Sequence, residues 1–201
     1  MQNFSSLFGD LENQDWGVAD AALPAGLADG LLQECQRSWQ AGTFHEAHVG
    51  RGAGKNLSTV IRGDSILWLE TESAQQYVNE FFAWAADLRS ALNQRYFLGL
   101  KSEEFHFARY PAGNGYQKHL DQHRGQNERK ISLVLYLNPD WKDADGGQLR
   151  LFSPDDPDKE VALISPRMGR LVLFKSDVVP HEVLPCFQIR SSLTGWYRTD
   201  F

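Results

Sequence analysis

The chain has 201 residues, of which 42% are hydrophobic and 12% aromatic, so it is long enough to bury the core of one domain. Its formal net charge of −6 comes without a long run of one sign, which argues against a surface for nucleic acid. No early apolar stretch resembles a signal peptide, and no apolar run is long enough to span a membrane. We therefore expect a single cytoplasmic domain over residues 1–201.

Apolar spacing predicts helices in the first hundred residues. Side chains three or four positions apart are typical of an amphipathic helix, and they recur near residues 7–11, over 24–40 and over 73–93. Pro24 suits the first turn of the second helix. Cys35 lies on the apolar face of that helix, which favours a small buried hydrophobe over a disulfide partner.

Short strands and one long loop separate these helices. Residues 16–19 and 66–69 have the composition of strands, whereas residues 42–64 are rich in Gly, Ser and Asn and are interpreted as a loop. Three glycines and few apolar anchors cannot offset the entropy of ordering residues 45–60. We therefore expect this segment to be mobile when no substrate is bound.

From Glu104 onward the hydrophobic period changes to two residues, which is typical of strands. Residues 130–138 form the strongest strand, and apolar residues on both of its faces predict burial on both sides. Further short strand-like runs, separated by turns, occupy residues 148–152, 161–164, 170–175, 182–184 and 191–197. Many short strands after a helical segment predict a β-sandwich or barrel backed by helices.

A candidate metal site begins with His119 and Asp121. On an extended strand these two side chains point the same way, because side chains alternate across a strand. His181, in a strand-like run, is the best third partner. Two His and one carboxylate form the facial triad of non-haem Fe(II) oxygenases. The alternative is a solvated loop in which the pair does nothing, but Arg190, nine residues after His181, favours the metal site.

Arg190 indicates the co-substrate. Three later residues share its face of the last predicted strand: Ser192, Thr194 and Trp196. If that face points inward, Arg190 places a forked cation in the pocket, and a buried Arg needs a carboxylate partner. The distal carboxylate of 2-oxoglutarate meets this need, and the Tyr136 hydroxyl could donate to the same group. The alternatives are an ordinary ion pair for Arg190 and a core position for Tyr136.

Several stretches together resemble a known family. They are residues 62–68, 110–121 with its Gly-Asn-Gly-Tyr turn, 135–141, 146–152, 180–183 and 190–197. As a set they resemble the 2-oxoglutarate- and Fe(II)-dependent prolyl 4-hydroxylases, and among these the hypoxia-inducible-factor prolyl hydroxylases and their bacterial relatives. The resemblance covers roughly residues 15–201. The turn before His119 is slightly shorter than in the family pattern, and the sequence ends at Phe201. Both departures bear on the substrate and leave the iron chemistry intact.

The resemblance implies a mainly β (α+β) fold, a double-stranded β-helix or jelly roll. Residues 1–100 would be its helical support and residues 101–201 its catalytic core. The resemblance assigns the iron ligands as His119, Asp121 and His181. It assigns the site of the 2-oxoglutarate carboxylate to Arg190 and Tyr136, with Tyr110 and Thr194 nearby. The candidate substrate residues are Arg129, at the pocket edge, and Trp196.

The implied activity is hydroxylation of a prolyl residue in a flexible loop of a protein. Fe(II) would be the cofactor, O2 and 2-oxoglutarate the co-substrates, succinate and CO2 the products, and ascorbate a reductant. One alternative keeps these cofactors with a free amino acid or other small molecule as substrate. Another is a non-catalytic metal-binding jelly roll that acts as a sensor, although such a module has no need of Arg190. The sequence does not indicate an oligomeric state.

Overall fold

The computed structural model describes residues 4–47, 62–122 and 127–201. The helices in these ranges are α1 (Ser5–Gln14), α2 (Leu27–Gln40), α3 (Gln76–Tyr96) and the short 3-10 helix η2 (Asp143–Asp145). The strands are β1 (Trp16–Ala19), β2 (His45–Glu46), β3 (Ser65–Trp68), β4 (Ser102–Tyr110), β5 (Tyr116–His119), β6 (Arg129–Tyr136), β7 (Leu149–Phe152), β8 (Glu160–Ile164), β9 (Leu171–Lys175), β10 (His181–Val183) and β11 (Arg190–Arg198).

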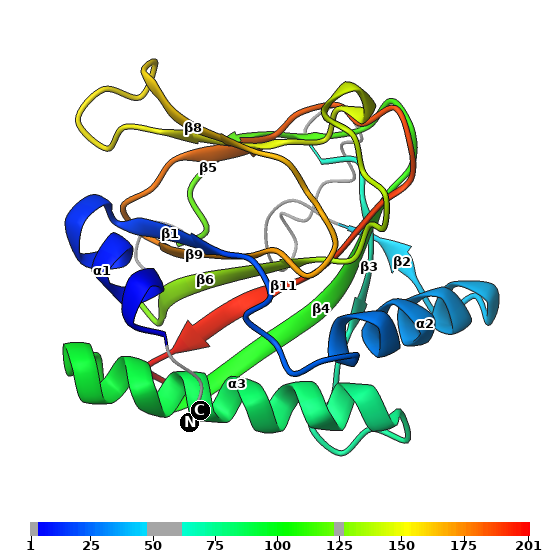
Figure 1. Cartoon of the computed structure of the whole chain (residues 1–201), viewed down its shortest axis with the longest axis horizontal. Coiled ribbons are helices and arrows are strands. Elements are labelled where there is room, and N and C mark those ends of the chain that lie inside the picture. Colours follow the sequence, from blue (N-terminus) through cyan, green and yellow to red (C-terminus); the bar gives the residue numbers. More distant parts are fainter. Residues whose placement is uncertain (1–3, 48–61, 123–126) are drawn as a thin grey trace, which may run out of the picture.

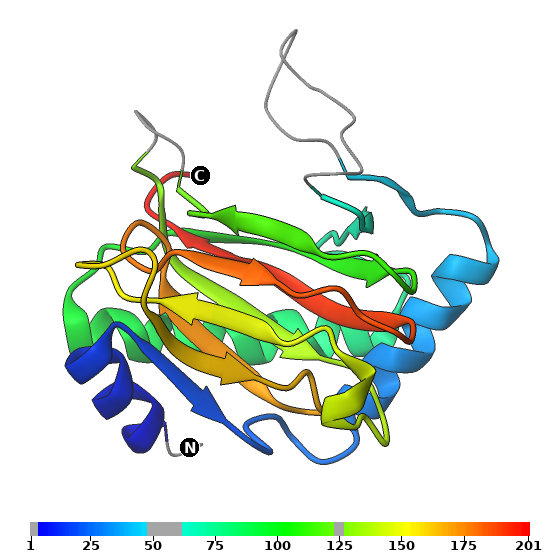
Figure 2. The ribbon, with the colours of Figure 1, turned by 90° about the horizontal axis from the view of Figure 1, so that it is seen from above.

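The strands form two facing sheets. The larger sheet has the order β1-β9-β6-β11-β4-β3-β2, the smaller has the order β5-β10-β7-β8, and the strand pairs are antiparallel. Figure 1 shows the smaller sheet above the larger one, and in Figure 2 the strands of both sheets are seen from above, with α3 behind them. This arrangement confirms the predicted helix-backed jelly roll.

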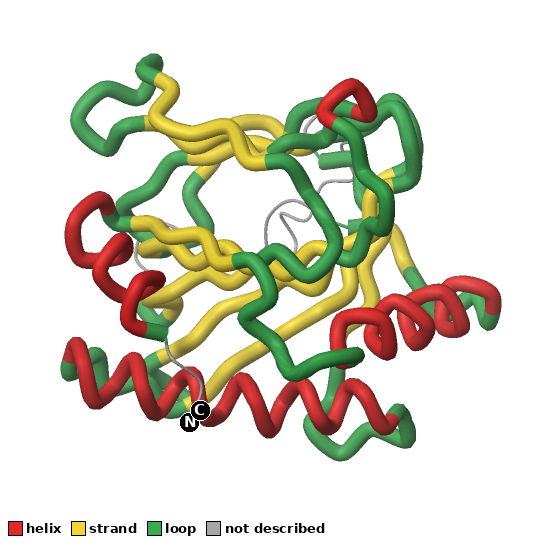
Figure 3. The backbone as a smooth tube through the Cα atoms, in the orientation of Figure 1, coloured by secondary structure: helices red, strands yellow, loops and turns green. Residues whose placement is uncertain are grey.

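The helices cover the outer face of the larger sheet, as Figure 3 shows for α3. The apolar stripe predicted for this helix is buried, and the ring of Phe81 packs edge-on against Phe105 of β4 with centroids 5.0 Å apart. The Tyr197 hydroxyl of β11 donates to the Ala85 carbonyl, which ties the helix to the sheet. Burial of each such large side chain stabilises the fold by roughly 1.5–3 kcal/mol.

Strand β6 separates two hydrophobic cores. Ile131, Leu133 and Leu135 face the helices, whereas Val134 and Tyr136 face the smaller sheet. All five are buried, so the prediction of a strand covered on both faces is confirmed. Because the second core lies between the sheets, polar side chains on the inner faces of the strands meet in one place.

Several strands differ from their predicted ends by one or two residues, and three elements differ more, namely α3, α2 and β2. Helix α3 begins and ends three residues later than expected, since Ser73 and Asn79 exchange hydrogen bonds that hold the preceding turn in a non-helical form. Helix α2 begins at Leu27 rather than Pro24. Strand β2 lies in the predicted loop. Its two residues have no alternating apolar pattern, and they form a strand because they pair with β3. The predicted mobile loop lies outside the described residues from position 48 to position 60.

Both cysteines are free and buried, Cys35 in the core under the helices and Cys186 in the core between the sheets. No helix within the described ranges combines the length and the apolar character needed to cross a membrane.

Candidate active site

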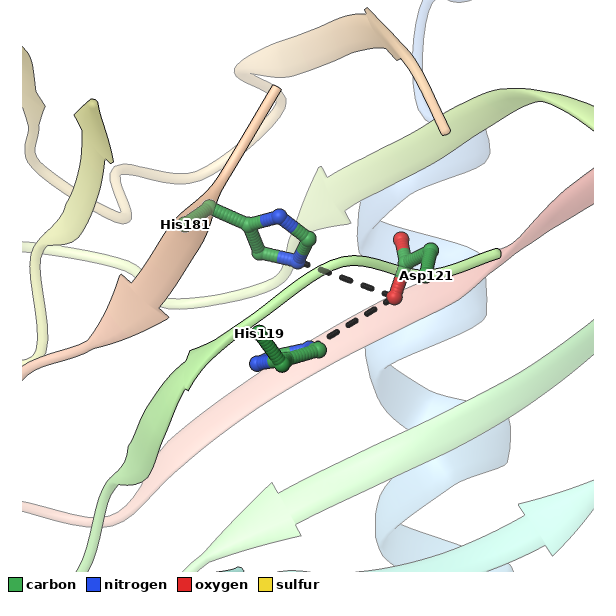
Figure 4. Close-up of side chains that lie close together, drawn as sticks. All are labelled: His119, Asp121 and His181. Atoms are coloured by element: carbon green, nitrogen blue, oxygen red, sulfur yellow. Dashed lines mark ion pairs between the residues drawn. The ribbon is translucent and has the colours of Figure 1, made fainter. Parts of the chain in front are cut away.

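The structure brings His119, Asp121 and His181 together between the sheets. Their ligand atoms all lie within 4.8 Å of one another. One carboxylate oxygen, Asp121 Oδ1, lies 3.5 Å from Nε2 of His119 and 3.6 Å from Nε2 of His181. Figure 4 shows the three side chains pointing toward a common centre. The pairing of β5 with β10 sets this geometry, because His119 and His181 are direct partners in the register.

The two histidines present the same nitrogen to that centre. Nδ1 of His119 lies 2.7 Å from the Gln117 carbonyl oxygen, and Nδ1 of His181 lies 3.0 Å from that of Val179. A carbonyl oxygen can only accept, so Nδ1 carries the proton in both rings. The lone pair of each Nε2 is therefore available to a metal ion, and the donor set fits Fe(II).

Charge interactions keep the carboxylate in its ligand form. Burial acts to raise the pKa of Asp121, but the two histidines outweigh it and hold that pKa well below the ordinary value. Burial and the neighbouring His181 lower the pKa of His119. Burial also acts to lower the pKa of His181, but the Asp121 carboxylate outweighs burial there, and the pKa of His181 is raised. A metal ion would displace the proton from His181, because ligands bind in their deprotonated forms.

The prediction that Asp121 lies on the same strand as His119 is wrong. The side chain lies two residues beyond the end of β5, and not on an extended strand with His119. Its second oxygen, Oδ2, accepts a hydrogen bond of 2.6 Å from the buried hydroxyl of Ser132. Nothing in the spacing of the sequence singled out Ser132, which stands in a strand whose other inward residues are apolar or aromatic.

A cavity of about 310 Å³ opens beside the three residues, and Arg190 lies within its lining. Arg190 is only 2% exposed, and its Nε donates to the Gly147 carbonyl oxygen at 2.9 Å. In the described part of the chain no carboxylate forms an ion pair with this guanidinium. The alternative that Arg190 forms an ordinary ion pair within the protein is therefore not supported by the described residues, and a ligand carboxylate fits the position.

Tyr136 and Tyr110 flank this cation. The guanidinium carbon of Arg190 lies 5.1 Å from the centroid of each ring. The Tyr136 hydroxyl is buried and finds no acceptor among the described residues. Tyr110 lines the cavity, whereas Tyr136 is fully buried and is not part of its lining. Burial raises the pKa of both hydroxyls, which keeps them protonated as donors. Thr194 lines the same cavity from β11, on the face that the period-two pattern predicted.

Arg129 and Trp196 lie together at another part of the lining. The guanidinium carbon of Arg129 is 3.4 Å from the centroid of the Trp196 ring, and Arg129 also pairs with Glu104 at 2.8 Å. The buried Nε1 of Trp196 has no partner within the described ranges. Nearby Trp68 is 42% exposed. Trp196 and Trp68 give this part of the lining an aromatic character, and the charge of Arg129 is balanced by Glu104.

Comparison with known proteins places this geometry in a family. Residues 105–198 match the model of the 2OG-Fe(II) oxygenase superfamily. The crystal structure of a Pseudomonas putida prolyl-4-hydroxylase superposes with a TM-score of 0.86 and 41% identity, over 96% of this chain and 97% of that one. The chain belongs to the family of 2OG-Fe(II) prolyl hydroxylases.

Animal relatives agree with this assignment to the prolyl hydroxylases. A Trichoplax adhaerens prolyl hydroxylase, solved in complex with a hypoxia inducible factor peptide fragment, has a TM-score of 0.83 and 30% identity, covering 96% of this chain and 88% of that one. Human Egl nine homolog 1 is 34% identical over 144 residues, which are 68% of this chain and 33% of the human protein. The chain thus spans about a third of that curated relative. The predicted cofactor Fe(II), with 2-oxoglutarate and O2, is confirmed as that of the family.

One further contact beside the site was not anticipated. The ring of Tyr116 stacks on His119, with centroids 3.7 Å apart and planes 19° apart. The guanidinium carbon of Arg62 lies 5.0 Å from the centroid of the Tyr116 ring. The same guanidinium donates two hydrogen bonds, of 2.7 and 3.0 Å, to the Asp64 carboxylate. The resemblance included Arg62 and Asp64, but no spacing rule relates them to His119, which lies more than fifty residues further along the chain.

The stability of the folded chain is expected to fall on acidification because of His106, a buried residue of the cavity lining. Burial and the positive charges of Arg62 and Arg129 lower the pKa of His106 from 6.5 to about 3, although Asp64 and Asp121 act in the opposite direction. Below about pH 6.5 the unfolded chain takes up a proton that the folded protein refuses until about pH 3. The free energy of unfolding should therefore decline by up to roughly 1.4 kcal/mol per pH unit across this window.

Urea unfolding of the wild type and of His106→Gln at several pH values measures this effect. The variant should show a smaller loss of stability between neutral pH and the acid end of the window. Equal pH slopes for the two proteins would exclude His106 as the source.

Proposed function

We propose that this chain is a 2-oxoglutarate- and Fe(II)-dependent dioxygenase that hydroxylates a prolyl residue in a protein and releases succinate and CO2. The observation that carries the proposal is the presence of Arg190, a buried cation with no carboxylate partner in the described residues, in the same cavity as the His-Asp-His cluster. A metal-binding module alone would have no use for such a cation, whereas a keto acid with a distal carboxylate needs one.

In this proposal the iron ligands are His119, Asp121 and His181. Bound Fe(II) supplies oxygen activation, with positions left open for the co-substrates. The protein holds the keto acid by its far end: Arg190 gives a two-pronged, charge-assisted hydrogen bond and the orphan hydroxyl of Tyr136 adds another. The cavity wall beside them comes from Tyr110 and Thr194, which restrict how the co-substrate turns.

The proposed substrate is a peptide segment with a target proline, presented by a flexible loop of a protein. Arg129 and Trp196 would contact it, because both line the cavity, and the exposed Trp68 ring offers an apolar face to a prolyl ring. The related Trichoplax enzyme was solved with such a peptide. The balanced charges of the Arg129–Glu104 pair suit an uncharged residue next to the target.

We further propose that residues 1–201 act as one dioxygenase domain, in which residues 1–100 support a catalytic core over residues 101–201. Side chains of both segments share the core under the helices, which supports one unit. A cytoplasmic location is proposed because two free thiols suit a reducing compartment. Ascorbate is proposed as a reductant and is tested by omitting it from the assay.

The purified chain should be assayed with Fe(II), 2-oxoglutarate and a panel of prolyl peptides, each with a matched peptide that has alanine in place of the proline. We expect succinate together with a mass gain of one oxygen atom on the prolyl peptides alone. Succinate without peptide oxidation would favour the free amino acid or small-molecule alternative. The assay is repeated with free amino acids in place of the peptides, and absence of succinate in both series would favour the non-catalytic sensor.

A further inference from the structure

Asp121 is held from behind by two buried hydroxyl groups. Ser132 of β6 and Ser176, which follows β9, are both fully buried. Ser132 Oγ lies 2.6 Å from Asp121 Oδ2 and 2.9 Å from Ser176 Oγ. The backbone supports the same contact, since the Gln122 amide next to Asp121 donates to the Ser176 carbonyl oxygen at 3.1 Å. An aspartate beyond the end of its strand is thereby fixed to β6 and to the residue that follows β9 in the opposite sheet.

The direction of these hydrogen bonds follows from counting protons. An ionised carboxylate can only accept, so the single hydroxyl proton of Ser132 goes to Asp121. Ser132 can then only accept from Ser176, which must be the donor in the second contact. The result is a chain with one direction, from Ser176 to Ser132 to Asp121. Each donor strengthens the next, because hydrogen bonds in series polarise one another.

Because of this series of hydrogen bonds, the two carboxylate oxygens of Asp121 have different partners. Oδ1 faces both histidine Nε2 atoms, at 3.5 and 3.6 Å, while Oδ2 is occupied by the Ser132 hydroxyl. We propose that Ser132, oriented by Ser176, is a positioning residue that makes Asp121 bind the metal through one oxygen only. The inference rests on the proposed metal site. A second oxygen on the metal would take a position that the keto acid or oxygen needs.

The sequence context supports a specific role for Ser132. By alternation along β6 the side chain is on the same face as Val134 and Tyr136, which belong to the apolar cluster between the sheets. A hydroxyl in such surroundings is costly unless it is hydrogen-bonded. Asp121 and Ser176 are the partners that satisfy it, so the pair of serines is explained by the carboxylate and not by the packing of the core.

Metal binding without turnover tests the proposal. Mn(II) would be titrated calorimetrically into the full chain as the wild type, Ser132→Ala, Ser132→Thr and Asp121→Ala. Loss of a hydrogen-bond partner behind a metal ligand typically weakens affinity by roughly 10- to 100-fold. We expect that loss in Ser132→Ala, with recovery in Ser132→Thr, which keeps the hydroxyl. The visible absorption of bound Co(II), which reports coordination number, should change in Ser132→Ala because the freed oxygen can join the metal.

Ser191→Ala is the matched control. Ser191 is a buried serine of β11 whose side chain faces the helices, so its Mn(II) affinity and Co(II) spectrum should equal those of the wild type. Thermal unfolding without metal reports whether each variant is folded. If Ser132→Ala does not fold, Ser176→Ala serves instead, since it removes only the outer donor and should weaken Mn(II) binding to a smaller extent.

Three results would overturn the inference, and the last of them is distinguishable from the first two. Wild-type affinity and spectrum in a folded Ser132→Ala protein, or in Ser176→Ala where that variant replaces it, would show that the hydroxyl does not position the ligand. An equal loss in Ser132→Ala and Ser132→Thr would have the same meaning. If Asp121→Ala keeps the wild-type Mn(II) affinity, the metal site itself is wrong and the inference falls with it.

Discussion

Replacement of Arg190 by alanine should raise the 2-oxoglutarate concentration needed for half-maximal succinate formation by at least tenfold. The buried guanidinium has no carboxylate partner among the described residues, so the co-substrate would lose its charge-assisted, two-pronged contact. Loss of one partner of a buried charge pair costs on the order of 2–5 kcal/mol, and ~1.4 kcal/mol is one decade of affinity. The measurement is a titration of 2-oxoglutarate at saturating Fe(II).

Two further variants sharpen the test of Arg190. Arg190→Lys keeps the charge but not the planar fork, so it should fall between the wild type and Arg190→Ala. Arg167→Ala removes an exposed arginine that pairs with Asp143 away from the cavity, and should leave the titration unchanged. Mn(II) affinity in the absence of 2-oxoglutarate should be retained in Arg190→Ala, because Arg190 is not a ligand. Coincident titration curves for Arg190→Ala and the wild type would make Arg190 a purely structural residue.

Alanine at His119, Asp121 or His181 should abolish Fe(II) binding and succinate formation while the fold persists. Each change removes one of three ligands whose donor atoms lie within 4.8 Å of one another. The large cores on both faces of β6 do not depend on these side chains, so circular dichroism and thermal unfolding without metal should resemble those of the wild type.

His106→Gln is the control for these ligand variants. It changes another imidazole of the same cavity, and it should retain metal binding because His106 lies outside the cluster of three. Full Fe(II) affinity in any of the three alanine proteins would remove that residue from the proposed site.

Much of the fold could be predicted because the sequence expresses it through local patterns. Strand β1 was placed at its observed bounds, and the inward face of β11 was identified from alternation alone. The apolar stripe of α3 identified its buried side. These features depend on side chains only a few positions apart in the sequence, so their pattern can be read without knowledge of the fold.

The parts that were missed depend on contacts between distant residues. β2 exists because His45 and Glu46 find partners in β3, and neither residue carries a strand pattern of its own. The sequence identified His119, Asp121 and His181 as a set, but not that Asp121 leaves the strand and is held by Ser132. A serine in a buried strand is common, so only its position beside a carboxylate gives it meaning.

The place of β11 has a consequence for synthesis on the ribosome. Among the described strands β11 is the last to be made, yet it lies in the middle of the larger sheet between β6 and β4. Both neighbours keep an unpaired edge until residue 198 has emerged, and such edges attract other chains. Arg190, Thr194 and Trp196 arrive with the same strand. A partly made chain therefore cannot close its larger sheet, and the proposed keto-acid site would stay incomplete until β11 has emerged from the ribosome.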